Sequence, residues 1–426
     1  MDLRIHQPWI TALVTAILAC AQAVADPVTA ATTPLDSSVD VAGEIKLQGT
    51  LTGESWRSVS DGARPGSWWN TLLDVGCTLD LAKLDGPAGG SLFVQAHWVQ
   101  NRDGGTCFAA STGAFNPVSG LMASDHVRVF NLYYRQSWCG GAIGCKVGQL
   151  ALDDDFMGSA YAALFANSAF GAMPSQVGTP LPSACGYTSA FPIYPVAAPG
   201  VWLQLRPRAA FSWQMGIYDG GPGPDSKDNH GFDWDRSAHS GVLMFTEASW
   251  SYRLADGDAT LRVGGSYHNG HFENYDANQA GRTATIAHGL ASFYAVHDLV
   301  LATDTAGQPK LAVFGRVGRS PQQDRSVVTT CADAGFNWFA PLPARSSDVA
   351  GAAISCTKFG RAFRRATAPD GSASTETTLE LTYRARLTPR CSVQVDAQLL
   401  FKPTPDTASG RREVATVLGL RTQISF

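Results

Sequence analysis

Alternation of apolar and polar residues through residues 375–426 constrains the fold of this chain more than any other feature. In the segment 379–387 every second residue is apolar, and the residues between are charged or hydroxylated. The same period of two recurs at 393–401 and at 414–426. Side chains alternate between the two faces of a β-strand, so this period predicts strands with one apolar and one polar face.

The length of these strands suggests what the two faces meet. Each runs for about 11 residues, which is the length that lets a tilted strand cross a membrane. A soluble sheet that packs one face on a core would alternate in the same way. Phe426, however, ends the sequence in phase with the apolar positions. We therefore predict the closing strands of a transmembrane antiparallel β-barrel, with lipid outside and water inside.

The first 25 residues have the features of a secretory signal peptide. A weakly basic start precedes an apolar run, and residues 23–25, Ala-Val-Ala, satisfy the small-x-small cleavage rule. We expect residues 1–25 to be removed, and residues 26–426 to form one outer-membrane barrel domain. Cys20 stands in a loose lipoprotein-like sequence, so lipidation is an alternative to its removal with the signal.

Composition agrees with strands joined by polar loops. The chain is 45% hydrophobic with 43 glycines, and its mean hydropathy of −0.05 is too polar for a helical membrane protein. A net charge of −4 gives no indication of a nucleic-acid partner. At about 25 residues per strand and connection, the mature chain would form about 16 strands.

One segment departs from the strand pattern. Three aspartates at 153–155 lead into an alanine-rich stretch at 160–171, which could form a short helix. We predict a short helical or irregular insertion that folds inward and narrows the barrel. The aspartates alone could also form a cation site or a solvated turn.

The alternation along the predicted strands identifies a set of polar residues that would face the lumen. It places the following residues on the wet face of predicted strands: Asp74, Arg206, Gln214, Glu247, Arg253, Arg262, Glu380, Arg384, Arg386, Asp396 and Arg421. The alternative for each residue is a wall charge that neutralises a neighbour or contacts an inserted loop.

Several ordered stretches resemble the carbohydrate-selective porins of the OprB type. They include Tyr-Ala-Ala-Leu-Phe-Ala-Asn-Ser at 161–168 and Tyr-Pro-Val-Ala-Ala-Pro-Gly at 194–200, together with 148–150, 155–156, 264–270, 332–337, 379–383 and 417–421. The resemblance runs over nearly the whole mature chain. It implies a barrel of 16 strands in the outer membrane of a Gram-negative bacterium, which passes glucose and related sugars by diffusion. The cysteine content and the residues at 401–403, Phe-Lys-Pro, depart from the family pattern. The resemblance therefore does not determine which sugars pass.

Sugar passage needs a narrow, polar constriction. Arginine–carboxylate pairs replace water around hydroxyls, and aromatic faces cover the apolar side of a sugar ring. The resemblance around Gly62-x-Arg64-x-Gly66 makes Arg64, Trp68 and Trp69 the preferred constriction residues, although an exterior loop or an interfacial aromatic belt is the alternative. The full candidate set is Arg64, Trp68, Trp69, Asp155, Asn167, Arg206, Glu247, Glu380, Arg384 and Arg421.

Other function classes find little support in the sequence. It contains no Gly-x-Ser-x-Gly and no His-Glu-x-x-His, so we expect no enzyme activity, no cofactor and no metal site. The expected partners are small sugars and outer-membrane lipid, with the chain a monomer or a loose homo-oligomer. Two alternatives stay open: a plugged structural or adhesive barrel whose loops bind a partner, and a secreted soluble lectin or hydrolase.

Eight cysteines remain after the expected cleavage, an even number that permits disulfides in an oxidising compartment. Cys331 and Cys356 flank the turn at 341–343 at nearly equal distances. This spacing predicts a disulfide between them.

Overall fold

Sixteen long antiparallel strands close into a barrel in which every strand pairs with its sequence neighbours, and the last strand pairs with the first. The computed structural model describes residues 38–40, 43–59, 66–102, 112–181, 190–237, 239–254, 257–277, 286–367, 373–401 and 414–426. The predicted signal peptide at 1–25 and Cys20 lie outside these residues. The number of strands and their antiparallel order confirm the sequence-based prediction.

The barrel strands are β2 (Ile45–Ser58), β3 (Ser67–Asp80), β4 (Gly90–Asn101), β5 (His126–Trp138), β6 (Ile143–Leu150), β7 (Ala198–Arg208), β8 (Phe211–Asp219), β9 (Val242–Leu254), β10 (Gly257–Glu273), β11 (Ile286–Thr303), β12 (Pro309–Arg319), β13 (Val328–Phe339), β14 (Val349–Phe359), β15 (Thr375–Thr388), β16 (Cys391–Phe401) and β17 (Val414–Ser425). A short additional strand, β1 (Ser38–Asp40), pairs with the start of β2.

Closure joins β17 to β2, from Ser425 opposite Thr50 to Val417 opposite Ser58. Beyond the last strand, Phe426 exchanges two backbone hydrogen bonds with Gly49, at 3.0 and 3.1 Å. The Phe426 ring covers Gly49, where an added Cβ would lie 2.2 Å from the ring. A side chain at position 49 would therefore displace this aromatic ring from its place on the seam.

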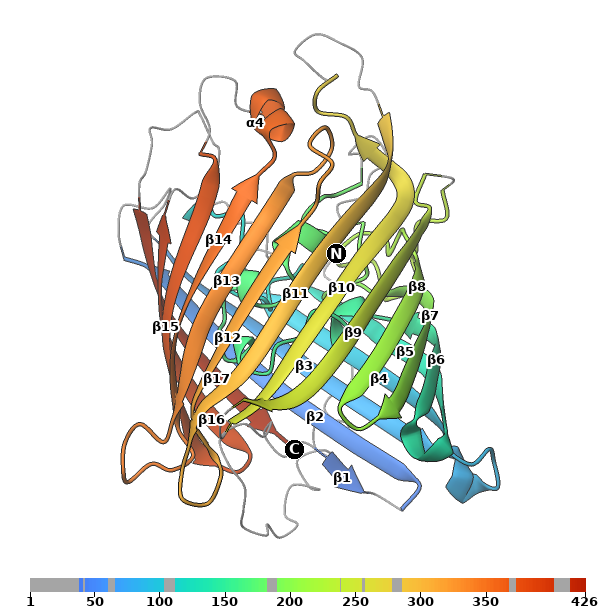
Figure 1. Ribbon diagram of the computed structural model, residues 1–426, viewed down its shortest axis with the longest axis vertical. Helices are drawn as coiled ribbons and strands as arrows, with labels where there is room; N and C mark the ends of the chain where they lie inside the picture. Colours follow the sequence, from blue (N-terminus) through green and yellow to red (C-terminus); the bar gives the residue numbers. More distant parts are fainter. Residues whose placement is uncertain are drawn as a thin grey trace, which may run out of the picture.

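The two ends of the barrel differ in their connections (Figure 1). Tight turns such as 209–210 and 389–390 join strands at the end that holds β1 and Phe426, which we call the short-turn end. The long connections, including 151–197 and 220–241, start from the opposite, long-loop end. Short turns on the periplasmic side and long loops outside are the rule in outer-membrane barrels.

Within the part of the chain that the structure describes, the helical elements are all short. They are the 3₁₀ turns η2 (Leu81–Leu84), η4 (Cys139–Gly141), η5 (Leu152–Asp154), η6 (Ala162–Leu164) and η7 (Ser168–Phe170), and the α-helices α3 (Pro174–Val177) and α4 (Arg361–Thr367). Among the described residues no helix has the length and apolar character needed to span a membrane. The turn between β5 and β6 contains Gly140 and Gly141, and both glycines have positive φ, at 64° and 90°.

The alternation read from the sequence sorts side chains between outside and inside. Leu381, Val395 and Leu418 point outward and are 52%, 51% and 47% exposed. Glu380 and Gln398, on the same strands, are fully buried inside the barrel. An apolar exterior around a polar interior is the arrangement expected for strands that meet lipid on one side.

The connection 151–197 is here called the insertion, and its described residues, 151–181 and 190–197, fill much of the interior. Its Leu152, Phe156 and Met157 pack against the wall residues Trp202 and Phe245 in one buried apolar cluster. Because each such side chain contributes about 1.5–3 kcal/mol on burial, the insertion is a packed element of the structure. The predicted inward-folded insertion is confirmed, but its alanine-rich part forms single 3₁₀ turns instead of a helix.

Candidate functional site

Carboxylates of the barrel wall hold the insertion across the lumen. Glu380 on β15 accepts the backbone N–H groups of Ala166 and Asn167, at 2.6 and 2.9 Å. Glu247 on β9 accepts the N–H of Met157, at 3.1 Å. Two acidic side chains of the inner wall thus help to place the insertion.

Donors from other strands take the carbonyl groups of the same segment. Arg316 on β12 donates to the carbonyl oxygens of Ala169 and Gly171, at 2.8 and 2.7 Å, and its Nε lies 2.8 Å from Asp333. Gln394 on β16 donates to the carbonyl of Leu164 at 2.8 Å. Since buried backbone groups need partners, this set of wall side chains fixes the course of the insertion.

A second segment, residues 112–125 from the β4–β5 connection, also enters the lumen. Glu376 on β15 accepts the N–H groups of Phe115 and Asn116, at 2.6 and 2.9 Å. Glu54 on β2 accepts the hydroxyl of Ser119 at 2.7 Å and pairs with Arg421. The barrel therefore grips two inserted segments by the same device.

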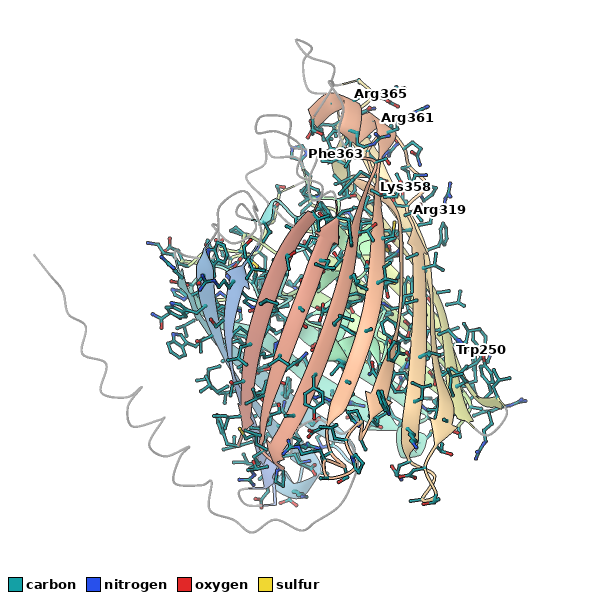
Figure 2. The ribbon with its side chains drawn as sticks, turned by 90° about the vertical axis from the view of Figure 1, so that its left-hand side faces the viewer. Trp250, Arg319, Lys358, Arg361, Phe363 and Arg365 are labelled. Carbon is teal, nitrogen blue, oxygen red and sulfur yellow. The ribbon has the colours of Figure 1, made fainter. Side chains whose placement is uncertain are left out.

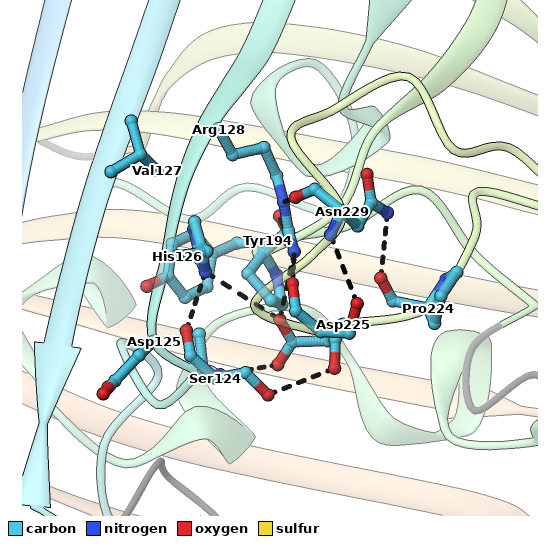
Figure 3. Close-up of polar contacts among 12 residues, drawn as sticks. Ser124, Asp125, His126, Val127, Arg128, Tyr194, Pro224, Asp225 and Asn229 are labelled. Carbon is cyan, nitrogen blue, oxygen red and sulfur yellow. Dashed lines mark hydrogen bonds and ion pairs between the residues drawn. The ribbon is translucent and has the colours of Figure 1, made fainter. Parts of the chain in front are cut away.

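A buried arginine ties the loops together at the long-loop end (Figure 3). Arg128 on β5 is 1% exposed and donates to the backbone carbonyls of Pro195 and Asn229. Its guanidinium also lies 3.4 Å from Asp225, whose carboxylate accepts the N–H of Ser124 at 2.8 Å. One side chain thus joins the insertion, the segment 112–125 and the connection 220–241.

A cavity of about 510 Å³ remains between the insertion and the wall, on the short-turn side. Strands β5 to β10 and the aspartates of the insertion surround it. Its charged and aromatic lining consists of Arg135, Lys146, Arg206, Arg262, Asp154, Asp155, Glu247, Trp202 and Phe211. The lining combines four basic and three acidic side chains with two aromatic rings. It therefore offers donors, acceptors and apolar surface within one polar space.

The centre of this lining is an ion pair beside an indole. Lys146 Nζ lies 2.6 and 2.9 Å from the two carboxylate oxygens of Asp155. The same ammonium group lies 4.8 Å from the centroid of Trp202, within the range of a cation–π contact. Trp202 Nε1 donates to Gln214 at 3.2 Å. These contacts hold the indole and the ion pair in one orientation.

The aspartates of the insertion lie outside the membrane-spanning strands and share one buried site. Burial raises the pKa of Asp154 to about 6, and the neighbouring Asp155 adds to the effect. Burial also raises the pKa of Asp155, which Lys146 opposes. Within the described residues there is no group of three His, Cys, Asp or Glu side chains placed to hold a metal ion. The arrangement instead gives the cavity a carboxyl group that titrates in mildly acidic solution.

Three of the predicted site residues, Asp155, Arg206 and Glu247, meet at this cavity. The other predicted residues that the structure describes do not line it. Asn167 and Glu380 hydrogen-bond to each other under the insertion, and Arg421 pairs with Glu54. Arg384 stands opposite Gln394, one strand pair from Arg421. For Glu380 and Arg421, wall charges engaged with neighbours or loops were the alternative interpretation, and the contacts agree with it.

The two tryptophans predicted to line the constriction face opposite sides of the barrel wall. Trp68 points inward and packs with Trp56 and Val118 in a buried cluster. Trp69 is 45% exposed on the outer face, so the prediction that it lines the constriction is wrong. Successive residues of a strand face opposite sides, and both tryptophans cannot enter the lumen. Arg64 lies outside the described residues.

The expected disulfide is also wrong for this structure. Cys331 and Cys356 are both free thiols. In the register of β13 and β14, Cys331 stands opposite Thr357 and Cys356 opposite Ala332. The two cysteines are therefore close along the sheet but point to opposite faces, Cys331 inward and Cys356 outward, and they cannot be bridged.

The residues that sequence reasoning missed are Arg135, Lys146 and Trp202. Arg128 and Arg135 have opposite parity in the sequence, yet both face inward. The reason is a β-bulge: Gln95 pairs with Asn131 and the next residue, Ala96, with Val129, so that one residue of β5 is left over. Lys146 and Trp202 lie on the inner face of β6 and β7, where parity alone would have found them.

Comparisons with known proteins find one matching family model and solved structures with the same barrel fold. A family model described as "Carbohydrate-selective porin, OprB family" matches residues 71–426. No curated protein sequence matches the chain. The high-pH structure of Pseudomonas putida OprB has a TM-score of 0.77 at 18% identity, covering 90% of this chain and 94% of that chain.

Two further solved structures are similar in fold. The low-pH structure of Pseudomonas putida OprB has a TM-score of 0.53 at 15% identity, covering 90% of this chain and 93% of that chain. The outer membrane channel DcaP of Acinetobacter baumannii has a TM-score of 0.52 at 10% identity, covering 92% and 100%. At these identities the structural likeness speaks for the fold.

Proposed function

The chain belongs to the OprB family of carbohydrate-selective porins, and from this membership we propose that it passes glucose and related small sugars by passive diffusion across the outer membrane. The proposed constriction is the cavity between the insertion and strands β5 to β10. The observation that carries the proposal is the lining of this cavity, in which the Lys146–Asp155 pair lies beside the face of Trp202.

The chemistry of the lining suits a neutral, polyhydroxylated solute. Arg135, Arg206 and Arg262 supply N–H donors that cannot lose their charge, and the carboxylates supply acceptors. Trp202, which is 3% exposed, lies beneath the Lys146 ammonium and fixes the position of this donor for the solute. Lys146 already pairs with Asp155, and Arg262 with Asp298 at 2.9 Å, so at these positions the solute replaces water and breaks no ion pair. Binding of that kind stays weak enough for flux.

The size of the space is compatible with a small sugar. A cavity of about 510 Å³ falls within the range of about 300–1,000 Å³ found for small-molecule sites.

We further propose that residues 1–25 direct export and are cleaved, and that residues 26–426 form the mature barrel. We propose that the barrel acts as a monomer or a loose homo-oligomer, without enzymatic activity.

Liposome swelling with sugars of increasing size tests the proposal directly. We expect liposomes that contain the protein to swell in isotonic glucose, and the rate to fall sharply for oligosaccharides. Addition of glucose should also block single-channel ion current with millimolar affinity, equivalent to roughly 3–4 kcal/mol.

The packed interior motivates the second candidate, a plugged barrel. Glu380, Arg316 and Glu376 hold the inserted segments tightly across the lumen. A plugged barrel would give neither swelling nor conductance for any sugar, and that outcome would replace transport with a structural or adhesive role. Conductance without glucose block would keep the channel and remove its sugar selectivity.

A further inference from the structure

Four exposed cations gather on the outer wall near the long-loop end (Figure 2). They are Arg319 on β12, Lys358 on β14, and Arg361 and Arg365 on α4, and we call them the rim patch. Arg319 stands opposite Thr330, and Thr330 opposite Lys358, so both cations lie in one row across three strands. Neighbouring strands are about 4.8 Å apart, which places the two Cα atoms about 10 Å apart.

The other two cations are held by the docking of α4. Ala362 is 3% exposed, and the ring of Phe363 packs against Phe359 and Tyr275 with centroids 6.4 and 5.2 Å apart. Arg361 and Arg365 are four residues apart, so they share one face of the helix. With the opposite face anchored, both guanidinium groups point away from the barrel, as Figure 2 shows.

Charge pairing distinguishes the rim patch from the lumen. In the described part of the chain, none of its four cations forms an ion pair with a carboxylate, whereas Lys146, Arg262, Arg316 and Arg421 of the lumen each do. Near the patch, the carboxylate of Asp324 is already paired with Arg325 at 2.9 Å. Gathered like charges repel, so an anion from outside the protein would stabilise this arrangement.

The wall directly below the patch is apolar. Val317, Ile354 and Phe336 point outward and are 50%, 50% and 41% exposed. Between them lie small residues, among them Ala332 and Ala334 on the outer face of β13. A row of cations above a shallow apolar strip matches a ligand with an anionic head and hydrocarbon chains.

We propose that the rim patch and the outer face of β12–β14 bind a phosphate-bearing anionic lipid of the surface leaflet. Its phosphates would contact Arg319, Lys358 and the arginines of α4, and its acyl chains would lie along the apolar strip. A second copy of the chain fits less well, because a symmetric contact through this patch would bring like charges together. Each cation near a charged membrane surface raises the binding constant by a factor of about five.

Native mass spectrometry of the detergent-purified chain, titrated with diphosphoryl lipid A, tests the proposal. We expect the wild type to prefer the diphosphoryl lipid over its dephosphorylated form. The double variants R319Q/K358Q and R361Q/R365Q should each bind it roughly 25-fold more weakly, a factor of about five for each cation. The matched control is R208Q/K310Q, which removes two exposed cations from the short-turn end.

Heat-modifiable migration and single-channel conductance report folding independently, and both should match the wild type because the rim patch lies outside the lumen. Equal binding of lipid A by the rim variants and the control would overturn the proposal. Equal binding of the dephosphorylated lipid would overturn the role of phosphate. Displacement of the lipid by millimolar inorganic phosphate would point to a free-anion site and overturn the lipid as ligand.

Discussion

Lys146 on β6 and Asp155 in the insertion form a bidentate contact, with the ammonium nitrogen 2.6 and 2.9 Å from the two carboxylate oxygens. Each group is only 10% exposed, so neither can turn to water for a replacement partner. The pair joins the wall to the insertion at the edge of the proposed constriction. It therefore contributes both to the position of the insertion and to the charge that a solute meets.

Replacing Lys146 with methionine should change ion selectivity. The substitution keeps the aliphatic length, removes one positive charge from the lining and leaves Asp155 without its cation, a loss that costs about 3–5 kcal/mol for a buried pair. We expect a shift of the reversal potential toward cation preference in a KCl gradient, and a less heat-resistant folded form. Lys310→Met, an exposed cation at the short-turn end, is the control. An unchanged reversal potential would exclude Lys146 from the ion path.

Trp202 should hold the Lys146–Asp155 pair that a sugar meets in the lining. Trp202→Ala removes an indole that is 3% exposed and lies 4.8 Å from the Lys146 ammonium, so glucose block of the ion current should weaken by about tenfold, the loss of a cation–π contact of about 1.5 kcal/mol. Trp250→Ala is the matched control, because Trp250 is 40% exposed on the outer wall. If both variants keep the wild-type block, the sugar passes elsewhere.

Glu380 should control how tightly the insertion is held. Glu380→Gln replaces one of two acceptor oxygens by an amide group that faces the N–H of Ala166 or Asn167. Because a buried donor is then left without a partner, we expect a loss of about 1–3 kcal/mol in stability and noisier, larger single-channel currents. Asp85→Asn, at an exposed turn, should leave both unchanged. If the single-channel currents of Glu380→Gln match those of the wild type in noise and amplitude, that result would argue against this anchoring role.

The pH dependence of selectivity should follow Asp154. Its pKa is raised to about 6 by burial and by Asp155, so below that pH the side chain is neutral and the lining is more basic. As pH rises from about 5 to about 7, anion preference should fall. Stability should fall between about pH 4 and about pH 6, because in that range the folded chain holds a proton that the unfolded chain has lost, and it should be constant at higher pH. Reversal potentials against pH should flatten in Asp154→Asn, and a slope equal to that of wild type would assign the titration to another group.

Gly49 and Gly53 offer a matched test of barrel closure on one face of β2. A methyl group at Gly49 meets the ring of Phe426 at 2.2 Å, whereas one at Gly53 has no atom within 4 Å. Gly49→Ala should therefore lower the fraction of heat-modifiable folded protein, and Gly53→Ala should not. The double variant Gly49→Ala/Phe426→Ala removes the clash but also the ring. Equal folding of both single variants would show that the ring is free to move aside.

The fold was predictable from sequence because a barrel strand is a local pattern. Parity alone placed Leu381 outside and Glu380 inside, and each assignment depends only on its neighbours along the strand. Trp69 shows the limit of resemblance as a guide: parity of β3 already separated it from Trp68. Where the local pattern is interrupted, as at the bulge of β5, parity cannot carry across, and Arg135 was missed.

The site was less predictable because its contacts join distant residues. Glu380 was correctly placed inside, but its partner Ala166 lies 214 positions away, and no periodicity connects the two. In the same way, Cys331 and Cys356 are symmetric in the sequence about a turn, yet a register offset of one residue separates them across the sheet. Which charges face open space and which face an inserted loop is decided only by the course of that loop.

Glu380, Glu376 and Arg316 hold the inserted segments by main-chain groups, which every residue except proline offers alike. Because the wall binds main-chain groups, its contacts do not depend on which side chains the inserted segments carry. Substitutions in the insertion that face the cavity can therefore accumulate during evolution, or be introduced by an engineer, while the surrounding socket stays the same. The proposed constriction of this barrel is in that sense an exchangeable part, whose side chains can diverge faster than the strands that hold it.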